Sequence, residues 1–411
     1  MEYGCIGEKL THSFSKIIHS KIADYNYELK EIAKADLETF MKNADFKAIN
    51  VTIPYKQAVI PYLYEISDTA RKIGAVNTIV NKGGKLYGYN TDYEGMRALI
   101  KRQGADLSGK KVLILGSGGT SKTAAAVAES LGAKEVLRVS RGGNDGAVTY
   151  EYALSNHTDA EAIINTTPCG MYPNIDVSPL DISAFKRLEG VVDAIYNPLR
   201  SKIVCDAQKR GIKAVGGLYM LISQAVFAAE KFLDTDIEPQ KTDAVYKSIL
   251  NQKQNIVLVG MPGSGKTTVG KLLAEKLELE FLDTDDLITE KYGNITDIFK
   301  TKGEAVFRDY ESEVIKEISA VGGKVIATGG GAVLRPQNTD LLKRNGRIYF
   351  LDRPLESICA TPDRPLSSNR KDLEKRFNER YDIYRNCADR HITSDGTETD
   401  TVNAVLEDIL K

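Results

Sequence analysis

The sequence has few cysteines and no arrangement of them that would build a site. Five occur among 411 residues, none forms a Cys-x-x-Cys pair, and the number is odd. This argues against a disulfide framework and against a thiolate zinc site. It suits a reducing cytosol, so we expect a cytoplasmic protein. The five are Cys5, Cys169, Cys205, Cys359 and Cys387.

A charge excess of either sign is also lacking, because the formal net charge is only −1. Such a chain has no overall field that would attract nucleic acid or an anionic membrane, and we expect neither as a partner. The most apolar window, "AVGGLYMLISQAVFAAE" at 214–230, is short for a membrane span and predicts a glycine turn leading into a buried helix. The start, "MEYGCIGEKLTHSFSK", has no basic segment followed by an apolar core, so no signal peptide is expected.

The length and the apolar content allow two or three domains with sizeable cores. Residues 1–95 contain the predicted strands "EYGCIG", "KAINVTI", which we expect Pro54 to end, and "LYGYNTD", which we expect to run into a loop. Residues 110–220 alternate strand and helix patterns, which predicts a parallel doubly wound sheet. The polar segment 234–254 predicts a domain boundary, and a second α/β rhythm follows it.

A first glycine turn follows the predicted strand "KKVLILG", with Gly116, Gly118 and Gly119 in "LGSGGTSK". It would let a pyrophosphate approach the N–H groups at the start of the next helix. A tight turn that binds nothing is the alternative. The next strand ends in Ser140 and Arg141 instead of an acidic residue. A guanidinium there suits the 2′-phosphate of NADP, and a solvated surface arginine is the alternative.

Lys56 in "NVTIPYK" and Asp92 in "YNTDYEG" are candidates for the proton transfer that a dehydrogenase needs. Such a pair can protonate an alkoxide as it forms and hold the amine in place. By residue chemistry alone, an exposed lysine and a turn aspartate explain these two residues better.

The blocks "GEKLTHSFSKIIH", "INVTIPYKQ", "IGAVNTIV", "GYNTDYEG", "LGSGGTSK", "NTTPCGM", "DAIYNPLRSKI" and "GGLYMLISQA" stand in the order seen in shikimate dehydrogenases. Residues 1–235 therefore resemble that family. The resemblance implies an α/β substrate domain, a Rossmann-like NADP domain, and Lys56 and Asp92 as the catalytic pair. It implies further substrate contacts from Ser13, Ser15, Thr52, Asn77, Tyr196 and Gln224. It implies NADP contacts from Gly116, Ser117, Gly118, Gly119, Thr120, Ser140, Arg141, Ala194 and Gly217. One departure is Lys16, where the family often has proline.

A second glycine loop, "GMPGSGKT" at 260–267, has the full G-x-x-x-x-G-K-[ST] form behind the apolar run "NIVLV". Its N–H groups would cradle phosphates, Lys266 would reach the β- and γ-phosphates, and the Thr267 hydroxyl would bind Mg²⁺. The pattern predicts a nucleotide-binding site, and an empty loop is the alternative. The residues that would bind ATP are Gly263, Ser264, Gly265, Lys266, Thr267 and Thr268.

The next predicted strand ends in "FLDTDDL". On an extended strand, Asp283 and Asp285 would share a face. One could then order the Mg²⁺ water shell while the other takes a hydroxyl proton. A polar strand end with helix-capping aspartates is the alternative.

The blocks "GEAVFRDYE", "ATGGGAV", "TPDRPLSS" and "NERYDIYR" follow in an order that resembles shikimate kinase over residues 253–411. The resemblance implies that Asp285 activates the ring hydroxyls, with Asp283 near Mg²⁺. It implies that Arg308 and Arg380 grip the substrate carboxylate, which suits their planar forks. It also implies a close substrate approach at Gly329, Gly330 and Gly331, and a catalytic phosphate contact from Arg364. Surface ion pairs are the alternative for the arginines.

Three features depart from the kinase pattern. The lid "ATPDRPLSSNR" is short, Cys359 and Ala360 stand where an arginine beside adenine is often found, and "RYDIY" lacks a proline at Asp382. These departures bear on the tightness of ATP binding.

Together, the two halves predict a bifunctional enzyme. It would reduce 3-dehydroshikimate to shikimate with NADPH, and then transfer the γ-phosphoryl group of ATP to shikimate with Mg²⁺. The alternatives are a quinate-accepting or NAD-preferring dehydrogenase, a kinase half that only binds nucleotide, and an interaction scaffold. The predicted limits are a substrate domain at 1–95 completed by about 218–235, an NADP domain at 96–217, a linker at 236–252 and a P-loop NTPase-type parallel α/β kinase domain at 253–411.

Overall fold

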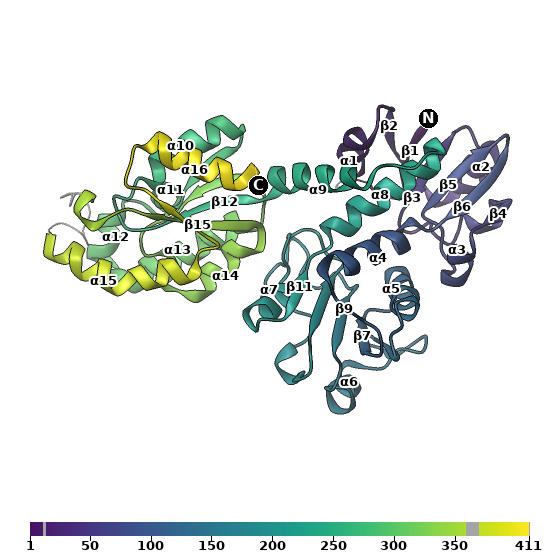
Figure 1. Ribbon diagram of the computed structural model, residues 1–411, viewed down its shortest axis with the longest axis horizontal. Helices are drawn as coiled ribbons and strands as arrows, with labels where there is room; N and C mark the ends of the chain where they lie inside the picture. Colours follow the sequence, from purple (N-terminus) through teal and green to yellow (C-terminus); the bar gives the residue numbers. More distant parts are fainter. Residues whose placement is uncertain (11–13, 359–369, 411) are drawn as a thin grey trace. The chain divides into compact units, whose positions relative to one another are not determined.

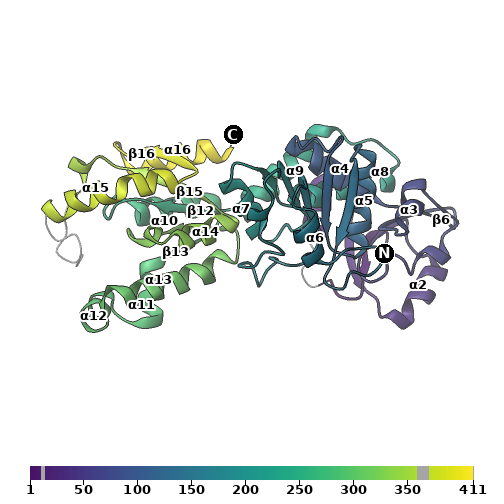
Figure 2. The same ribbon diagram turned by 90° about the horizontal axis from the view of Figure 1, so that it is seen from below.

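The computed structural model describes residues 1–10, 14–358 and 370–410. The chain forms two compact units, and most of their elements are labelled in Figures 1 and 2. The first unit comprises Met1–Met171, Val177–Tyr196 and Ser201–Ile249. The second comprises Tyr172–Asp176, Asn197–Arg200 and Leu250–Lys411.

The first unit begins with a mixed sheet in the order β2-β1-β3-β5-β6-β4. Strands β1 and β3 are parallel, whereas β5 is antiparallel to both β3 and β6. The strands are β1 (Tyr3–Gly7), β2 (Tyr27–Glu31), β3 (Ala48–Val51), β4 (Glu65–Ile66), β5 (Thr78–Lys82) and β6 (Lys85–Tyr89). The helices between them are α1 (Ser15–Ile22), α2 (Leu37–Asn43) and α3 (Asp68–Ile73), with 3₁₀ turns at Lys34–Asp36 and Ile60–Tyr62.

The second sheet of this unit is entirely parallel, in the order β11-β10-β9-β7-β8, as the strand–helix alternation predicts. Its strands are β7 (Lys111–Leu115), β8 (Glu135–Val139), β9 (Ala162–Asn165), β10 (Gly190–Asp193) and β11 (Lys213–Val215). Its helices are α5 (Gly119–Ser130), α6 (Tyr150–Asn156) and α7 (Lys202–Lys209), with a 3₁₀ turn at Ile182–Ala184.

Two long helices, α4 (Thr91–Gln103) and α8 (Leu218–Leu233), pack against each other beside these sheets (Figure 1). Helix α8 starts after Gly217 and buries residues along most of its length, which confirms the predicted glycine turn and buried helix. Among the described residues, every helix is too short or too polar to cross a lipid bilayer.

The second unit has one parallel sheet in the order β13-β14-β12-β15-β16. Its strands are β12 (Asn255–Val259), β13 (Glu280–Asp283), β14 (Lys324–Ala327), β15 (Gly346–Asp352) and β16 (Arg390–Thr393). Its helices are α10 (Lys266–Leu277), α11 (Thr284–Tyr292), α12 (Ile295–Thr301), α13 (Gly303–Ser319), α14 (Pro336–Asn345), α15 (Arg370–Cys387) and α16 (Glu398–Leu410). Short 3₁₀ turns lie at Ala332–Leu334 and Leu355–Ser357.

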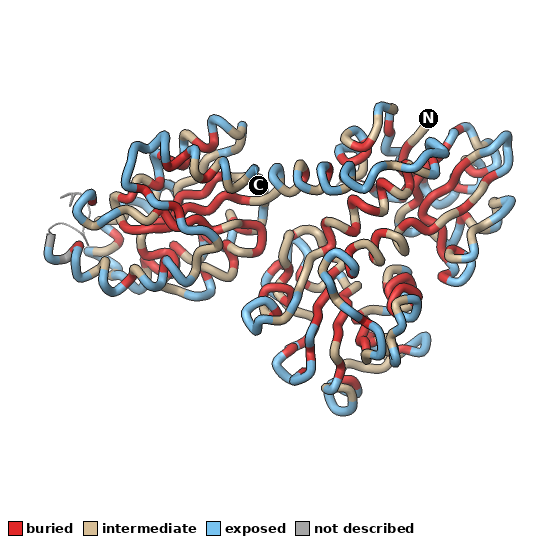
Figure 3. Tube along the Cα trace, in the orientation of Figure 1, coloured by how far each residue is buried: buried red, intermediate tan, exposed pale blue. Residues whose placement is uncertain are grey.

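The sheets carry the cores, because their central strands are buried along most of their length, whereas the edge strands are largely exposed or only partly buried (Figure 3). In β12, β9 and β10 every residue is buried, as expected for parallel strands covered on both faces. The carboxyl ends of parallel strands meet at one edge of a sheet, and this edge is where ligands bind in such folds.

The structure corrects two sequence expectations about where helices begin. Strand β6 ends at Tyr89 and α4 begins at Thr91, so Asp92 lies in the first turn of a helix and not in a loop. Strand β13 ends at Asp283 and α11 begins at Thr284, so Asp283 and Asp285 do not share the face of a strand. Asn90 caps α4 and Asp283 caps α11. Both are residues that favour a helix start, but each follows an apolar strand pattern, and the prediction followed the strand pattern.

The segment predicted as a linker is largely helical, as α9 (Pro239–Lys253). Its first part packs on the first unit through Arg102 of α4. The Arg102 guanidinium pairs with Asp243 at 2.5 Å and lies over the rings of Tyr219 and Tyr246, at 4.3 and 4.8 Å from their centroids.

Replacing Arg102 by alanine should loosen α9 without unfolding the sheets. Each cation–π contact contributes about 0.5–1 kcal/mol at a partly exposed site. We therefore expect Arg102→Ala to speed amide hydrogen exchange in 243–249, while exchange in β7 and β9 stays unchanged. Unchanged exchange in α9 would contradict the anchoring role of Arg102.

Candidate active sites

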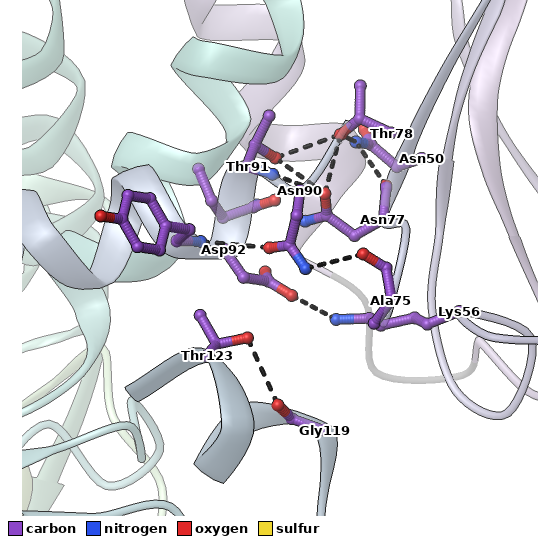
Figure 4. Close-up of polar contacts among 12 residues, drawn as sticks. Asn50, Lys56, Ala75, Asn77, Thr78, Asn90, Thr91, Asp92, Gly119 and Thr123 are labelled. Atoms are coloured by element: carbon purple, nitrogen blue, oxygen red, sulfur yellow. Dashed lines mark hydrogen bonds and ion pairs between the residues drawn. The ribbon is translucent and has the colours of Figure 1, made fainter. Parts of the chain in front are cut away.

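A lysine and an aspartate meet in a cavity of about 410 Å³ in the first unit (Figure 4). The Lys56 Nζ lies 2.5 Å from Oδ2 of Asp92. Both side chains are largely but not completely buried, at 26% and 17% exposure, so a ligand in the cavity can still reach them. Lys56 and Asp92 are 36 residues apart in the sequence. The sheet brings them together, because Lys56 follows β3 and Asp92 follows β6.

The first turn of α4 fixes Asp92 through its cap. The Asn90 side chain accepts a hydrogen bond from the Tyr93 N–H at 3.2 Å and donates one to the Ala75 carbonyl at 3.0 Å (Figure 4). Asn90 is buried, so both bonds are shielded from water. Asp92, two residues further on, is thus held by a cap that is itself bonded to the segment before β5.

The amide of Asn77 is oriented by neighbours in the same cluster. Its Oδ1 accepts from the Thr91 N–H at 2.7 Å and is 3.1 Å from the Thr78 hydroxyl (Figure 4). Asn50 donates to the Thr78 hydroxyl at 3.1 Å. Because the Asn77 oxygen is occupied, its amide N–H₂ is the group it can offer to a ligand.

Most of the predicted substrate contacts line this cavity. They are Ser15, Thr52, Lys56, Asn77, Asp92, Tyr196 and Gln224, together with Thr120, Ala194 and Gly217 from the predicted NADP set. Ser13 lies outside the described residues. Sequence reasoning missed Phe14, Asn50, Leu221 and Asn90, although Asn50 stands within "INVTIPYK".

The first glycine turn has the shape of a phosphate cradle. Gly116 has φ +125°, and a Cβ there would lie 2.5 Å from the Thr166 hydroxyl oxygen. By contrast, a Cβ at Gly118 or Gly119 would meet nothing within 4 Å, so space for a ligand adjoins the start of α5. This open helix N-terminus fits a pyrophosphate. Ser140 and Arg141 follow directly after β8, with Arg141 exposed to solvent.

A second cavity, of about 510 Å³, lies in the second unit around the other glycine loop. Lys266 is buried, and its Nζ donates to the carbonyls of Gly260 and Met261, both at 2.9 Å. Ser264 Oγ is buried and makes no hydrogen bond within the described part of the chain. A loop with a buried lysine and an unsatisfied hydroxyl fits a phosphate chain. The cavity is also lined by Gly263, Gly265, Thr267 and Thr268.

Asp283 caps α11 and contacts the predicted magnesium residue. The Thr267 hydroxyl donates to Oδ2 of Asp283 at 2.8 Å, and Oδ1 of Asp283 accepts from the Asp285 N–H at 3.0 Å. No cluster of three acidic, histidine or cysteine side chains that could hold a metal occurs among the described residues. One hydroxyl and one carboxylate suit Mg²⁺, which usually completes its shell with water and substrate phosphates.

Asp285 has a different environment from Asp283. Burial and the neighbouring charge of Asp283 raise the pKa of Asp285, while Lys266 and Arg308 act in the opposite direction. A carboxylate with a raised pKa is a better proton acceptor than an ordinary aspartate. The direction of this shift is compatible with the role of proton acceptor that the sequence predicts for Asp285, which lines the cavity.

Arg308 and Arg380 are buried in the same cavity, as the carboxylate assignment requires. Arg308 is already bonded to Glu311 at 2.8 Å and Glu304 at 3.0 Å, while Arg380 donates to the Gly330 carbonyl at 3.1 Å. These internal bonds fix both guanidinium groups in place. A Cβ at Gly331 would lie 2.2 Å from Nη1 of Arg308, so the guanidinium occupies the space directly beside this glycine.

Glu311 is a site residue that sequence reasoning missed. It is fully buried, lines the cavity, and keeps its second oxygen without a partner within the described residues. Burial raises the pKa of Glu311 to about 7, although Arg308 counteracts this. Its spacing three residues after Arg308, within "RDYE", was the available signal. Arg364 and Cys359 lie outside the described residues.

Comparison with known proteins assigns the two parts of the chain to families. Residues 5–79 match the model of the shikimate dehydrogenase substrate binding domain, and residues 262–410 match that of shikimate kinase. A shikimate dehydrogenase (NADP(+)) of Clostridium perfringens is 36% identical over 264 residues, covering 60% of this chain and 97% of its relative.

Solved structures show the same similarity. Shikimate dehydrogenase 1 of Peptoclostridium difficile is 36% identical with a TM-score of 0.55, covering 61% of this chain and 98% of its own. A chorismate mutase/shikimate 5-dehydrogenase fusion protein of Clostridium acetobutylicum is also 36% identical, with a TM-score of 0.57 and coverage of 60% and 96%. Shikimate 5-dehydrogenase of Thermus thermophilus, in complex with NADP(H) and shikimate, is 25% identical with a TM-score of 0.55, covering 60% and 99%.

The cap at Asn90 should matter for the rate at the first site as well as for stability. Asn90→Ala removes a cap that typically contributes about 1 kcal/mol and frees the helix turn that carries Asp92. We expect a lower kcat for the reaction at Lys56 and Asp92, measured by NADPH oxidation.

Thr149→Ala is the matched control, because Thr149 caps α6 by accepting from the Tyr152 N–H at 3.2 Å and does not line the cavity. It should lose similar stability and keep its kcat. An equal loss of kcat in both variants would contradict a specific role for Asn90.

Proposed function

We propose residue roles for the two cavities of this chain, which belongs to the shikimate dehydrogenase family and carries a shikimate kinase domain in its C-terminal part. The chain is a bifunctional enzyme of the shikimate pathway that uses NADP in one half and ATP in the other. One observation carries the proposal: each glycine turn adjoins a cavity lined by a partly buried carboxylate, Asp92 in one and Asp285 in the other.

In the first cavity, Lys56 moves the proton. As the ketone of 3-dehydroshikimate becomes an alkoxide, the Lys56 ammonium gives a proton to its oxygen, and shikimate results. When bound, NADPH supplies the hydride. Asp92, at 2.5 Å, keeps the ammonium oriented and balances its charge. We assign the carboxylate of the substrate to the Ser13 and Ser15 hydroxyls, and its ring hydroxyls to Asn77 and Gln224.

In the second cavity, Asp285 accepts the proton of the shikimate hydroxyl that attacks the phosphoryl group. Arg308 and Arg380 hold the carboxylate of shikimate, because both guanidinium groups are buried and fixed by internal bonds. Lys266 stabilises charge on the transferring phosphoryl group, and we assign the same task to Arg364. Thr267 and Asp283 would hold Mg²⁺, which would supply positive charge to neutralise the phosphates.

The product of the first reaction is thus the acceptor of the second. Both halves take small-molecule substrates of the shikimate type. We place the protein in the cytoplasm, because the four cysteines in the described part of the chain are free thiols.

Single substitutions should separate the two activities. Lys56→Ala should abolish NADPH oxidation with 3-dehydroshikimate and leave the phosphorylation of added shikimate at the rate of the unaltered chain. Asp285→Asn should do the reverse, because its amide cannot accept the hydroxyl proton. Loss of both activities from either substitution, in a chain that still folds, would contradict two separate sites.

The pH dependence of the kinase step should report the environment of Asp285. Since the pKa of Asp285 is raised above 3.8, its protonated and inactive form persists at less acidic pH. We expect kcat/KM for phosphorylation to fall as pH is lowered, with an apparent pKa above 3.8.

Asp286→Asn removes a nearby negative charge that also raises the pKa of Asp285. The fall in kcat/KM at acidic pH should therefore shift towards lower pH in this variant. Asp286 is exposed and lies outside the cavity lining, so the ATP cradle is preserved. If kcat/KM falls at the same pH in Asp286→Asn and in the unaltered chain, Asp285 is not the titrating base.

A further inference from the structure

An arginine with no assigned role stands at the edge of the phosphate loop. Arg353 is the residue after β15, and β15 pairs in parallel with β12 in a register that places Val259 opposite Phe350. Strand β12 opens directly into the glycine loop. The chain just beyond β15 therefore lies beside that loop, at the carboxyl edge of the sheet.

The guanidinium of Arg353 reaches the last glycine of the loop. A Cβ built on Gly265 would lie 3.7 Å from Nη1 of Arg353, which is van der Waals contact. Gly265 is the N-cap residue of α10, the helix whose first N–H groups point at a bound phosphate. Arg353 and Gly265 line the same cavity together with Lys266 and Thr268.

Arg353 has no anionic partner within the described residues, unlike Arg308. Its Nε is buried without a hydrogen bond, and no described carboxylate forms an ion pair with it. The neighbouring Asp352 accepts the Tyr381 hydroxyl at 2.8 Å instead. Glu398, which lines the cavity, is also not paired with Arg353.

This placement is electrostatically unfavourable unless an anion is bound. The N-terminus of α10 carries positive partial charge, and Lys266 adds a full positive charge beside it. A third positive group held there without a carboxylate is repelled by both. A phosphate between them removes this repulsion and offers the planar guanidinium two acceptor oxygens.

We propose that Arg353 binds the phosphate chain of the nucleotide at the Gly265 end of the loop, next to Lys266. The proposal rests on the proposed kinase function of this cavity. The shikimate carboxylate is a less suitable partner, because Arg380 and Arg308 lie beside Gly330 and Gly331, whereas Arg353 lies beside the nucleotide loop at Gly265. Arg353 is thus a phosphate-binding residue that none of the loop motifs contains.

Arg353→Ala should weaken nucleotide binding specifically. Loss of one charge-assisted hydrogen bond corresponds to about a tenfold weaker affinity or more. We expect the KM for ATP and the Kd for ADP, measured by titration calorimetry, to rise about tenfold. The KM for shikimate and the rate of NADPH oxidation should stay unchanged. Arg353→Lys should recover part of the affinity, because it keeps the charge and loses the planar fork.

Arg347→Ala is the matched control. Arg347 lies on β15, the strand that precedes Arg353, pairs with Asp408 at 3.1 Å and does not line the cavity. It should leave the Kd for ADP unchanged. A Kd for ADP that is equal in Arg353→Ala and the unaltered chain, with normal NADPH oxidation as proof of folding, would overturn the proposal.

Inhibition by adenosine, which has no phosphate group, tests which part of the nucleotide Arg353 binds. An inhibition constant for adenosine that is unchanged in Arg353→Ala supports a phosphate contact, whereas a tenfold rise would overturn it. If the unaltered chain binds ADP but transfers no phosphoryl group, the proposed kinase function fails. The comparison of ADP affinities still decides the role of Arg353 in that case.

Discussion

Both sites depend on one constraint: a buried parallel strand must turn into a helix within a few residues and leave the helix N-terminus open to a phosphate. Gly116 and Gly260 meet this constraint with φ of +125° and +150°. A side chain at Gly116 would strike the Thr166 hydroxyl, and one at Gly260 would lie 2.9 Å from the Leu351 carbonyl. The strands β7 and β12 are packed tightly enough to require glycine at both turns.

The two carboxylates to which we assign chemistry lie in different environments. Asp92 is bonded to the Lys56 ammonium group, which suits the proposal that Asp92 balances the charge of the lysine while the lysine donates the proton. Asp285 is partly buried beside another carboxylate, which makes its ionised form costly and the carboxylate more basic. One half of the chain can thus give a proton to an alkoxide, and the other half can remove a proton from a hydroxyl. These are the demands of ketone reduction and of phosphoryl transfer to an alcohol.

The sequence was sufficient to predict the parallel sheets, the buried helix α8 and the family of each half, because these follow from local patterns and ordered motifs. It could not predict the strand–helix boundary at Asp283. This residue is both the last residue of an apolar strand and the N-cap of the next helix, so the strand pattern and the capping pattern overlap there. Nor could it predict Glu311 or Arg353 as part of a cavity, since their places depend on which strands and helices become neighbours. The domain limits and the roles of the site residues remain predictions. Among them, Ser13 and Arg364 fall outside the described residues.

The central claim is that one chain reduces a ketone and then phosphorylates the resulting molecule. The most direct measurement supplies 3-dehydroshikimate, NADPH deuterated at the transferable position, Mg²⁺ and ATP labelled in the γ-phosphoryl group, and follows the products by mass. We predict a single final product that carries both the deuterium and the labelled phosphoryl group. A deuterated product that never acquires the phosphoryl group would contradict the account of the second site. Phosphoryl transfer to unreduced 3-dehydroshikimate would contradict the order of the two reactions.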